Sequence, residues 1–226
     1  MTKEKKPSIY QANPLIESRK PMNTLEMRLF LLALQNVNPH ISKNDKYYDK
    51  SFRELHLTPG EVKEIFGHGE YLHRLEQVCQ KLAQRTVAIH KDNGDFTYYS
   101  LFGFIRYEAA DGLRIKFNED MRPLILDILE SGYPYTKIDM KQIFQLSSAY
   151  AMRLLELMLQ YRGLMTDTKI VRSLQVDDIR FYLNVPDGAY SKMQDFKRRV
   201  LDAPIQEINE KTQYILSYES LNLSRL

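Results

Sequence analysis

The chain has 226 residues, a length that allows one large domain or two domains of about 100 residues each. A hydrophobic content of 43% and a charged content of 27% are typical of a folded globular protein, and they exclude disorder of the whole chain. The net charge of +3 and the pI of about 8.7 are only mildly basic. Any binding of nucleic acid must therefore rest on local clusters of positive charge.

Targeting signals and cysteine use point to the cytoplasm. The segment 1–10 is charged and is not followed by the apolar stretch of a secretory signal. The longest apolar run, Leu29–Leu34, is far too short to span a bilayer. Cys79 has no second cysteine to pair with, and its place on an apolar helix face predicts a small buried side chain.

The first quarter of the chain is predicted to be flexible up to residue 9 and then helical. Asn13-Pro14 is a possible helix cap followed by a first-turn proline. Asn23 and Glu26 form a capping pair for a second helix that ends before Asn38-Pro39, and a loop follows over residues 40–50. The apolar face of the second helix is predicted to be Leu25, Leu29, Leu32 and Ala33.

The next segment has the pattern of a helix-turn-helix. Residues 52–57 alternate weakly as a short strand, and Thr58-Pro59 opens a helix that ends at Gly67. A second helix follows the turn 68–70. Its predicted apolar face is Leu72, Leu75, Val78, Cys79 and Leu82, and its predicted outer face is His73, Arg74, Gln77, Lys81 and Arg85.

A β hairpin is predicted directly after these helices. Residues 86–90 and 96–102 are β-prone and are joined by a turn that contains Asn93-Gly94, a strong hairpin signal. A third strand is predicted over 113–117. The order strand, helix, turn, helix and hairpin is the outline of a winged helix.

The second half repeats this outline. Ser147 is predicted to cap a long helix that Gly163 ends, and residues 170–176 are predicted to be a strand. Asp177 caps a short helix to Leu183, and the turn 186–188 leads to a helix from about Ser191. A final strand is predicted over 213–218, and Pro204 is expected to bend or end the helix before it.

The two halves align at a common offset of 119 residues. Gly69-Glu70-Tyr71 matches Gly188-Ala189-Tyr190, and Arg53 matches Arg172 at the same offset. We therefore predict an α+β protein of two tandem winged helix-turn-helix domains with pseudo-twofold similarity. The expected bounds are 10–133 for the first domain and 134–226 for the second.

No pattern predicts catalysis, a metal or a cofactor. The five histidines form no pair with metal-ligand spacing, and no phosphate-binding glycine loop or nucleophile elbow occurs. Tyr98-Tyr99 could belong to a nicking enzyme, but the required His-apolar-His strand is absent. These tyrosines are expected to alternate between core and solvent, and the chain is not predicted to be an enzyme.

Positive charge gathers at the start of the last long helix. The basic residues there are Lys192, Lys197, Arg198 and Arg199, and the only acid near them in the sequence is Asp195. Acids follow from Asp202 onward. The helix macrodipole favours acids at this end, so the cluster is a local inconsistency of the kind expected in a DNA-reading helix. A solvated helix face with scattered charges is the alternative. The predicted DNA-binding residues here are Tyr190, Ser191, Lys192, Gln194, Lys197, Arg198 and Arg199.

The matching helix of the first domain is less basic. Its outward residues His73, Arg74, Gln77 and Lys81 are predicted to contact the DNA backbone or a second subunit rather than to read bases. Arg114 and Lys116 give one face of a strand a positive charge, which a solvated sheet face explains equally well.

Three stretches resemble the initiator replication proteins of theta-replicating bacterial plasmids that carry iterons. They are NTLEMRLFLL from Asn23, LSSAYAMRLLEL from Leu146, and FKRRVL from Phe196 with Glu207-Ile208-Asn209. The resemblance covers roughly residues 8–218. It implies two winged helices, with the helix Ser191–Asp202 in the major groove of origin repeats.

The same resemblance implies the partners and the biology. Such a protein binds double-stranded direct repeats as a monomer, opens the origin, recruits the host initiator and replicative helicase, and represses its own gene as a dimer through the first domain. A dimeric transcriptional regulator without an origin function is the alternative, and a module that binds protein is a second. The family pattern continues past Tyr214–Tyr218 with a basic turn and a returning strand, so the second wing is expected to be incomplete here.

Overall fold

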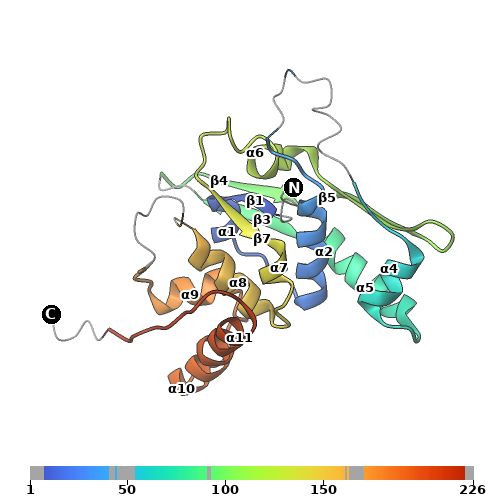
Figure 1. Ribbon diagram of the computed structural model, residues 1–226. Helices are drawn as coiled ribbons and strands as arrows, with labels where there is room; N and C mark the ends of the chain where they lie inside the picture. The colour runs from blue at the N-terminus through green and yellow to red at the C-terminus, as the bar shows by residue number, and fades with distance from the viewer. Residues whose placement is uncertain are drawn as a thin grey trace, which may run out of the picture.

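The computed structural model describes residues 8–40, 44, 54–90, 93–160, 162 and 171–221. Helix α2 (Thr24–Gln35) lies at its centre, between the α4–α5 pair on one side and α7, α8 and the C-terminal helices on the other (Figure 1). Seven of the residues of α2 are buried and form a broad face, whereas Arg28, Leu32 and Gln35 are partly or fully exposed. A helix with so wide a buried face packs against the core from several sides.

Local capping sets the start of α2, as the sequence predicts. The side chain of Asn23 accepts a hydrogen bond from the backbone N–H of Glu26, and its amide donates to the Glu26 carboxylate. Glu26 is itself buried and accepts two hydrogen bonds from Arg85. The prediction that Arg85 faces outward is therefore wrong, because this guanidinium neutralises a buried carboxylate.

The first winged helix combines α2 with α4 (Pro59–Phe66) and α5 (Tyr71–Ala83). Thr58 is the N-cap of α4, as predicted, and it forms a capping box with Glu61, which was not predicted. Gly67 ends that helix with a φ of +94°. The buried face of α5 begins at Tyr71, whose hydroxyl pairs with that of Tyr107. Because Tyr71 fills the core position at the helix start, Leu72 is 54% exposed, contrary to prediction.

The sheet of this domain has the order β2-β6-β5, from β2 (Leu55–Leu57), β5 (Phe102–Glu108) and β6 (Gly112–Phe117). The wing is the β5–β6 hairpin. The expected wing, β3 (Thr86–His90) with β4 (Phe96–Ser100), does form around Asn93-Gly94, but it is a separate two-stranded sheet. The chain turns at the buried Leu101 and starts β5, a strand that the sequence pattern did not predict.

A second two-stranded sheet ties the beginning of the described chain to its middle. Strand β1 (Ser8–Ala12) pairs antiparallel with β7 (Tyr135–Asp139). Neither strand was predicted, and β1 includes two residues of the segment expected to be flexible. Helix α1 (Asn13–Glu17) follows, with Ala12 rather than Asn13 at its N-cap. The predicted domain boundary at 133 falls just before β7 and stays a prediction.

Short helices link the sheets to the second half. The 3₁₀ turn η1 (Glu119–Met121) leads to α6 (Arg122–Ile125), and α7 (Met140–Ile143) follows β7. Helix α8 (Ala149–Leu159) then begins with Ser148, not Ser147, as its cap, because the Ser148 hydroxyl accepts from the N–H of Ala151. The helix ends at Gln160, and the predicted end at Gly163 lies outside the described residues.

The second winged helix is built mainly of helices. Helix α9 (Val176–Tyr182) is followed by a turn and by one continuous helix made of α10 (Met193–Phe196), the π-helical η3 (Lys197–Asp202) and α11 (Ala203–Lys211). We call this the C-terminal helix. Residues 171–175 and 213–218, predicted as strands, pair with no strand in the described part of the chain. The segment after the helix is held instead by Asn209, whose side chain bonds both the N–H and the carbonyl of Leu216.

No helix among the described residues is long and apolar enough to cross a bilayer.

Candidate nucleic-acid interface

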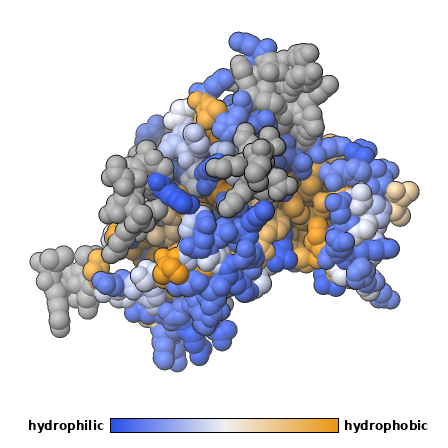
Figure 2. All heavy atoms as spheres, viewed as in Figure 1, coloured by the Kyte–Doolittle hydropathy of each residue, from blue (hydrophilic) through white to orange (hydrophobic). Residues whose placement is uncertain are grey.

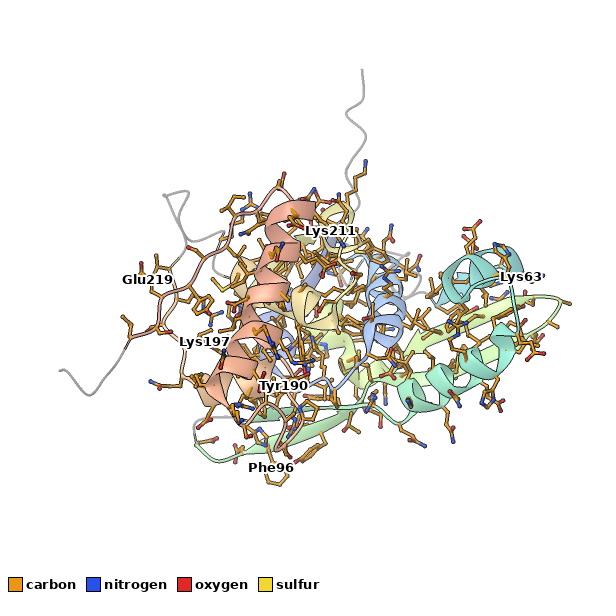
Figure 3. All side chains as sticks on the ribbon, turned by 90° about the horizontal axis from the view of Figure 1, so that it is seen from below. Lys63, Phe96, Tyr190, Lys197, Lys211 and Glu219 are labelled. Atoms are coloured by element: carbon orange, nitrogen blue, oxygen red, sulfur yellow. The ribbon has the colours of Figure 1, made fainter. Side chains whose placement is uncertain are left out.

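The start of the C-terminal helix presents polar and cationic side chains to solvent. Lys192 is its N-cap residue and makes no side-chain cap, and Ser191, Lys192 and Gln194 are exposed. Arg198 is also exposed and pairs with Asp195 at 2.7 Å, and Lys197 is half-buried. Figure 3 shows the helix running from the region of Tyr190 past Lys197 to Lys211.

Pro204 was predicted to bend or end the helix, and it does not end it. The N–H of Ala203 bonds the carbonyl of Arg198, five residues back, so a π-helical turn leads into the proline. Proline has no N–H to donate, and the wider turn carries the helix past it. Residues four apart therefore stay on one line, and the buried line is Phe196, Val200, Pro204 and Ile208.

The opposite line of this helix changes charge along its length. Its exposed residues are Gln194, Arg198, Asp202, Gln206 and Glu210. The first two can match adenine and guanine edges, whereas the acids after them repel phosphate. The part of the helix able to approach DNA is therefore its first half, and Figure 2 shows a hydrophilic surface over this region.

Tyr190 lies in the turn before the C-terminal helix and contacts residues that the sequence did not predict. It adopts a left-handed backbone conformation with a φ of +51°. Arg180 holds this turn, donating to the carbonyls of Ala189 at 2.8 Å and Tyr190 at 2.6 Å while its guanidinium lies over the ring of Phe196. Arg199 lies 5.8 Å from the centre of the Tyr190 ring.

The side chain of Tyr190 forms a hydrogen bond with that of Tyr150. Burial raises the pKa of Tyr150 to about 12, and the neighbouring Tyr190, including its hydrogen bond, acts in the same direction. Tyr150 therefore stays a neutral hydrogen-bonding partner at physiological pH. Tyr190 orders the start of the helix, and a direct contact of its ring with DNA remains a prediction.

The predicted residues of the first domain are all at the surface. His73, Arg74, Gln77 and Lys81 are exposed on α5, and His73 and Gln77 share a hydrogen bond of 2.8 Å. Figures 1 and 3 place the α4–α5 pair, with Lys63 on α4, at the end of the molecule away from the C-terminal helix. The α5 residues and the C-terminal helix therefore form two separate polar surfaces.

The cationic strand face of the first wing is largely neutralised. Arg114 pairs with Asp111 and Glu54, and Lys116 pairs with Glu119 at 2.8 Å. Those carboxylates compete with DNA phosphates for the two basic side chains. Of the two interpretations, a solvated sheet face therefore fits this strand better than a DNA contact.

The histidines, Cys79 and the Tyr98-Tyr99 pair are the groups that the sequence offers for chemistry. The described residues contain no cluster of three His, Cys, Asp or Glu side chains placed to hold a metal. Cys79 is half-buried rather than fully buried, and burial raises the pKa of its thiol to about 11. Tyr98 is 62% exposed and Tyr99 is half-buried, as the predicted alternation requires.

Sequence reasoning missed Arg180 and Arg153. Arg153 lies inside an otherwise largely apolar helical stretch, and this position is the signal that could have found it. A charged residue in a helix core has to be paired, so a partner on the main chain or an acid was to be expected. Arg180 follows Asp177 and Asp178 in a helix with no buried residue, so the same signal is missing there.

These elements define the class of the chain, a tandem winged-helix protein with a helix-turn-helix in each domain. The model of the initiator replication protein family for its first winged helix, WH1, matches residues 8–159, and the model for the second, WH2, matches residues 175–225. The chain therefore belongs to the initiator replication protein family.

A solved relative has the same fold. The chain is similar to the Pi initiator protein in a crystal structure with iteron DNA, at 20% sequence identity and a TM-score of 0.65. The match covers 93% of this chain and 89% of that one. The WH1 model extends through α8, beyond the predicted boundary at 133.

Proposed function

We propose that this replication initiator binds double-stranded DNA at direct repeats in a plasmid origin and starts replication there. The supporting observation is the C-terminal helix, whose buried line turns Gln194 and Arg198 outward beside Ser191 and Lys192. Similarity to a protein solved with iteron DNA supports the same ligand. The α5 residues of the first domain then contact the DNA backbone.

Once bound, the initiator opens the origin in the bacterial cytoplasm and recruits the host initiator and replicative helicase. It needs no cofactor or enzymatic activity of its own. A dimeric form represses its own gene. The β3–β4 hairpin supports self-association, because His90, Phe96 and Tyr98 form an exposed ring cluster on one of its faces.

The test is replication of a minimal plasmid. A plasmid that carries this gene and the DNA directly upstream, but no other origin, should be maintained in the host. Deletion of the upstream repeats should abolish maintenance. If the protein binds and represses that DNA but the plasmid is lost, the transcriptional regulator is the correct function. If the protein fails to shift the DNA at low salt, a protein-binding module is favoured.

A further inference from the structure

Arg153 of α8 bonds the ends of two helices from different parts of the chain. Its Nη2 donates to the carbonyls of Ile16 at 2.6 Å and Ser18 at 3.1 Å, where α1 ends. The same nitrogen donates to the carbonyl of Tyr182 at 2.9 Å, and Nε donates to it at 3.2 Å, where α9 ends. Carbonyls at a helix C-terminus lack partners within their helix, and a cation is favourable there.

The charge of Arg153 is balanced inside the core. Glu156 accepts from Nη1 at 2.7 Å, and Gln11 of β1 donates to the other carboxylate oxygen at 2.6 Å. The Arg153 and Glu156 side chains are only 4% and 0% exposed. Because desolvation costs such a pair much of its attraction, burial of the pair is weak evidence that it adds stability, and the geometry that it fixes is the role to test.

The two helix ends lie side by side but belong to the parts of the chain that different family models match. Helix α1 follows β1 in the part matched by the WH1 model, and α9 begins the part matched by the WH2 model. From α9 the chain enters the turn that Arg180 clamps and then the C-terminal helix. A shift at Tyr182 would therefore move the start of that helix relative to the first domain.

We propose that Arg153 is a positioning residue, which fixes the orientation of the C-terminal helix relative to the first domain. It thereby sets the spacing between the DNA segments that the two domains contact. This inference rests on the proposed function, in which both domains touch one repeat. Only a planar guanidinium with several fixed donors can bridge both helix ends and Glu156 together, and lysine cannot.

The test compares Arg153→Lys with Arg19→Lys. Arg19 pairs with Asp187 at 3.3 Å between the same two parts of the chain, but the pair is exposed, so this variant is the matched control. The probes are a duplex of one upstream repeat and a series with one or two base pairs inserted along it. A protein with rigidly oriented domains should bind the duplexes with inserted base pairs about 10-fold or more weakly than the natural repeat. The reason is that the spacing of the contacted DNA segments is a geometric constraint.

Wild type and Arg19→Lys are expected to show that penalty. Arg153→Lys should bind the natural repeat about 10-fold more weakly and lose less than about 3-fold on insertion, since its domains reorient more freely. If Arg153→Lys binds every duplex more weakly but keeps the full insertion penalty, the proposal is wrong and Arg153 only stabilises the fold. If Arg153→Lys does not fold, the double variant Arg153→Met, Glu156→Leu takes its place, because it removes both buried charges. It is expected to show the same small insertion penalty as Arg153→Lys.

A measurement without DNA separates this inference from the proposed function. Spin labels at Gln77→Cys on α5 and Gln206→Cys on α11, in a Cys79→Ala background, report the distance between two exposed sites. The distribution should be narrow with Arg153 and broad without it. Equal widths would overturn the inference, whereas failure of the wild type to bind any upstream duplex would overturn the proposed function alone.

Discussion

At the scale of single residues, the carboxylate of Glu207 joins α11 to the first turn of α8. It accepts from the N–H and hydroxyl of Ser147, from the N–H of Ser148 and from Lys211. Burial by itself raises the pKa of Glu207, but the hydrogen bonds of Lys211 and Ser147 outweigh it and lower the pKa to about 2. The ionised form is therefore the one that stabilises the fold.

Replacing this residue should change the dependence of stability on pH. Because the folded pKa lies below the unfolded one, the contribution of Glu207 is present above about pH 4.5 and is lost as pH falls toward 2. Glu207→Gln should cost about 2 kcal/mol at pH 7 and flatten the loss of stability in acid, as measured by urea unfolding. Among the described residues the Glu210 carboxylate accepts only from Gln206, so Glu210→Gln is the control. Equal behaviour of the two variants would refute the role of Glu207.

Lys20 is a buried lysine with few compensating contacts. Its ammonium donates to Gln11 at 3.3 Å and lies over the ring of Phe30, and the residue is 1% exposed. Burial, and then repulsion from Arg153, hold the pKa of Lys20 well below its usual value, against the attraction of Glu156. The side chain therefore reduces stability at neutral pH.

Lys20→Met should raise the free energy of unfolding by about 1–3 kcal/mol at pH 7, because it removes a desolvated amine at similar volume. A folded pKa below the unfolded one makes wild-type stability rise with pH, so the gain should shrink toward pH 10.5. Thermal unfolding at pH 7 and pH 10 measures both effects. A less stable variant at pH 7 would show that the ammonium is charged and well paired.

Arg198 has the exposure and position to read a base. Arg198→Ala should cost about 1–3 kcal/mol of binding free energy and relax the preference at one base pair of the repeat. Gln206→Ala, on the same exposed line but past Asp202, should leave binding unchanged. Anisotropy titrations against a repeat mutated at each position measure both. A loss that is the same for every sequence would make Arg198 a phosphate contact instead.

At the scale of elements, local signals were predictable and distant pairings were not. Helices α2, α4 and α5 and the β3–β4 hairpin follow from caps, apolar spacing and Asn93-Gly94, which act within a few residues. Strands β1 and β7 exist only because they pair across most of the chain. Residues 213–218 have a strand-like pattern but no partner strand in the described residues, and a side chain, Asn209, replaces the ladder.

Gly112 determines how β2 and β6 meet. Its φ is +104°, and a Cβ there would lie 2.0 Å from the carbonyl oxygen of Leu57. Gly112→Ala should cost about 3 kcal/mol or more, from backbone strain and a clash with main chain that cannot move aside. Gly94→Ala is the matched control, because its φ is +89° but a Cβ meets no atom within 4 Å. That variant should lose only about 1 kcal/mol in the same denaturation experiment.

At the scale of the whole molecule, the sequence predicted the two winged helices and most of the exposed residues of each, but not what orients them. Charge and period place Lys192, Arg198 and Arg199 at the surface, as they do His73, Arg74, Gln77 and Lys81 of α5. Arg153 and Arg180 act on main-chain carbonyls of segments distant in sequence or separated by a turn. A carbonyl carries no residue identity, so no pattern of residue types reveals such a partner.

The central claim is that this chain binds repeated DNA sequence through the C-terminal helix. The most direct measurement is the affinity for a duplex of one upstream repeat and for a scrambled duplex, across a series of salt concentrations. We predict tighter binding of the repeat by at least about 1000-fold, with affinity that falls steeply as salt rises. Equal affinity for both duplexes, or binding that is insensitive to salt, would contradict the claim.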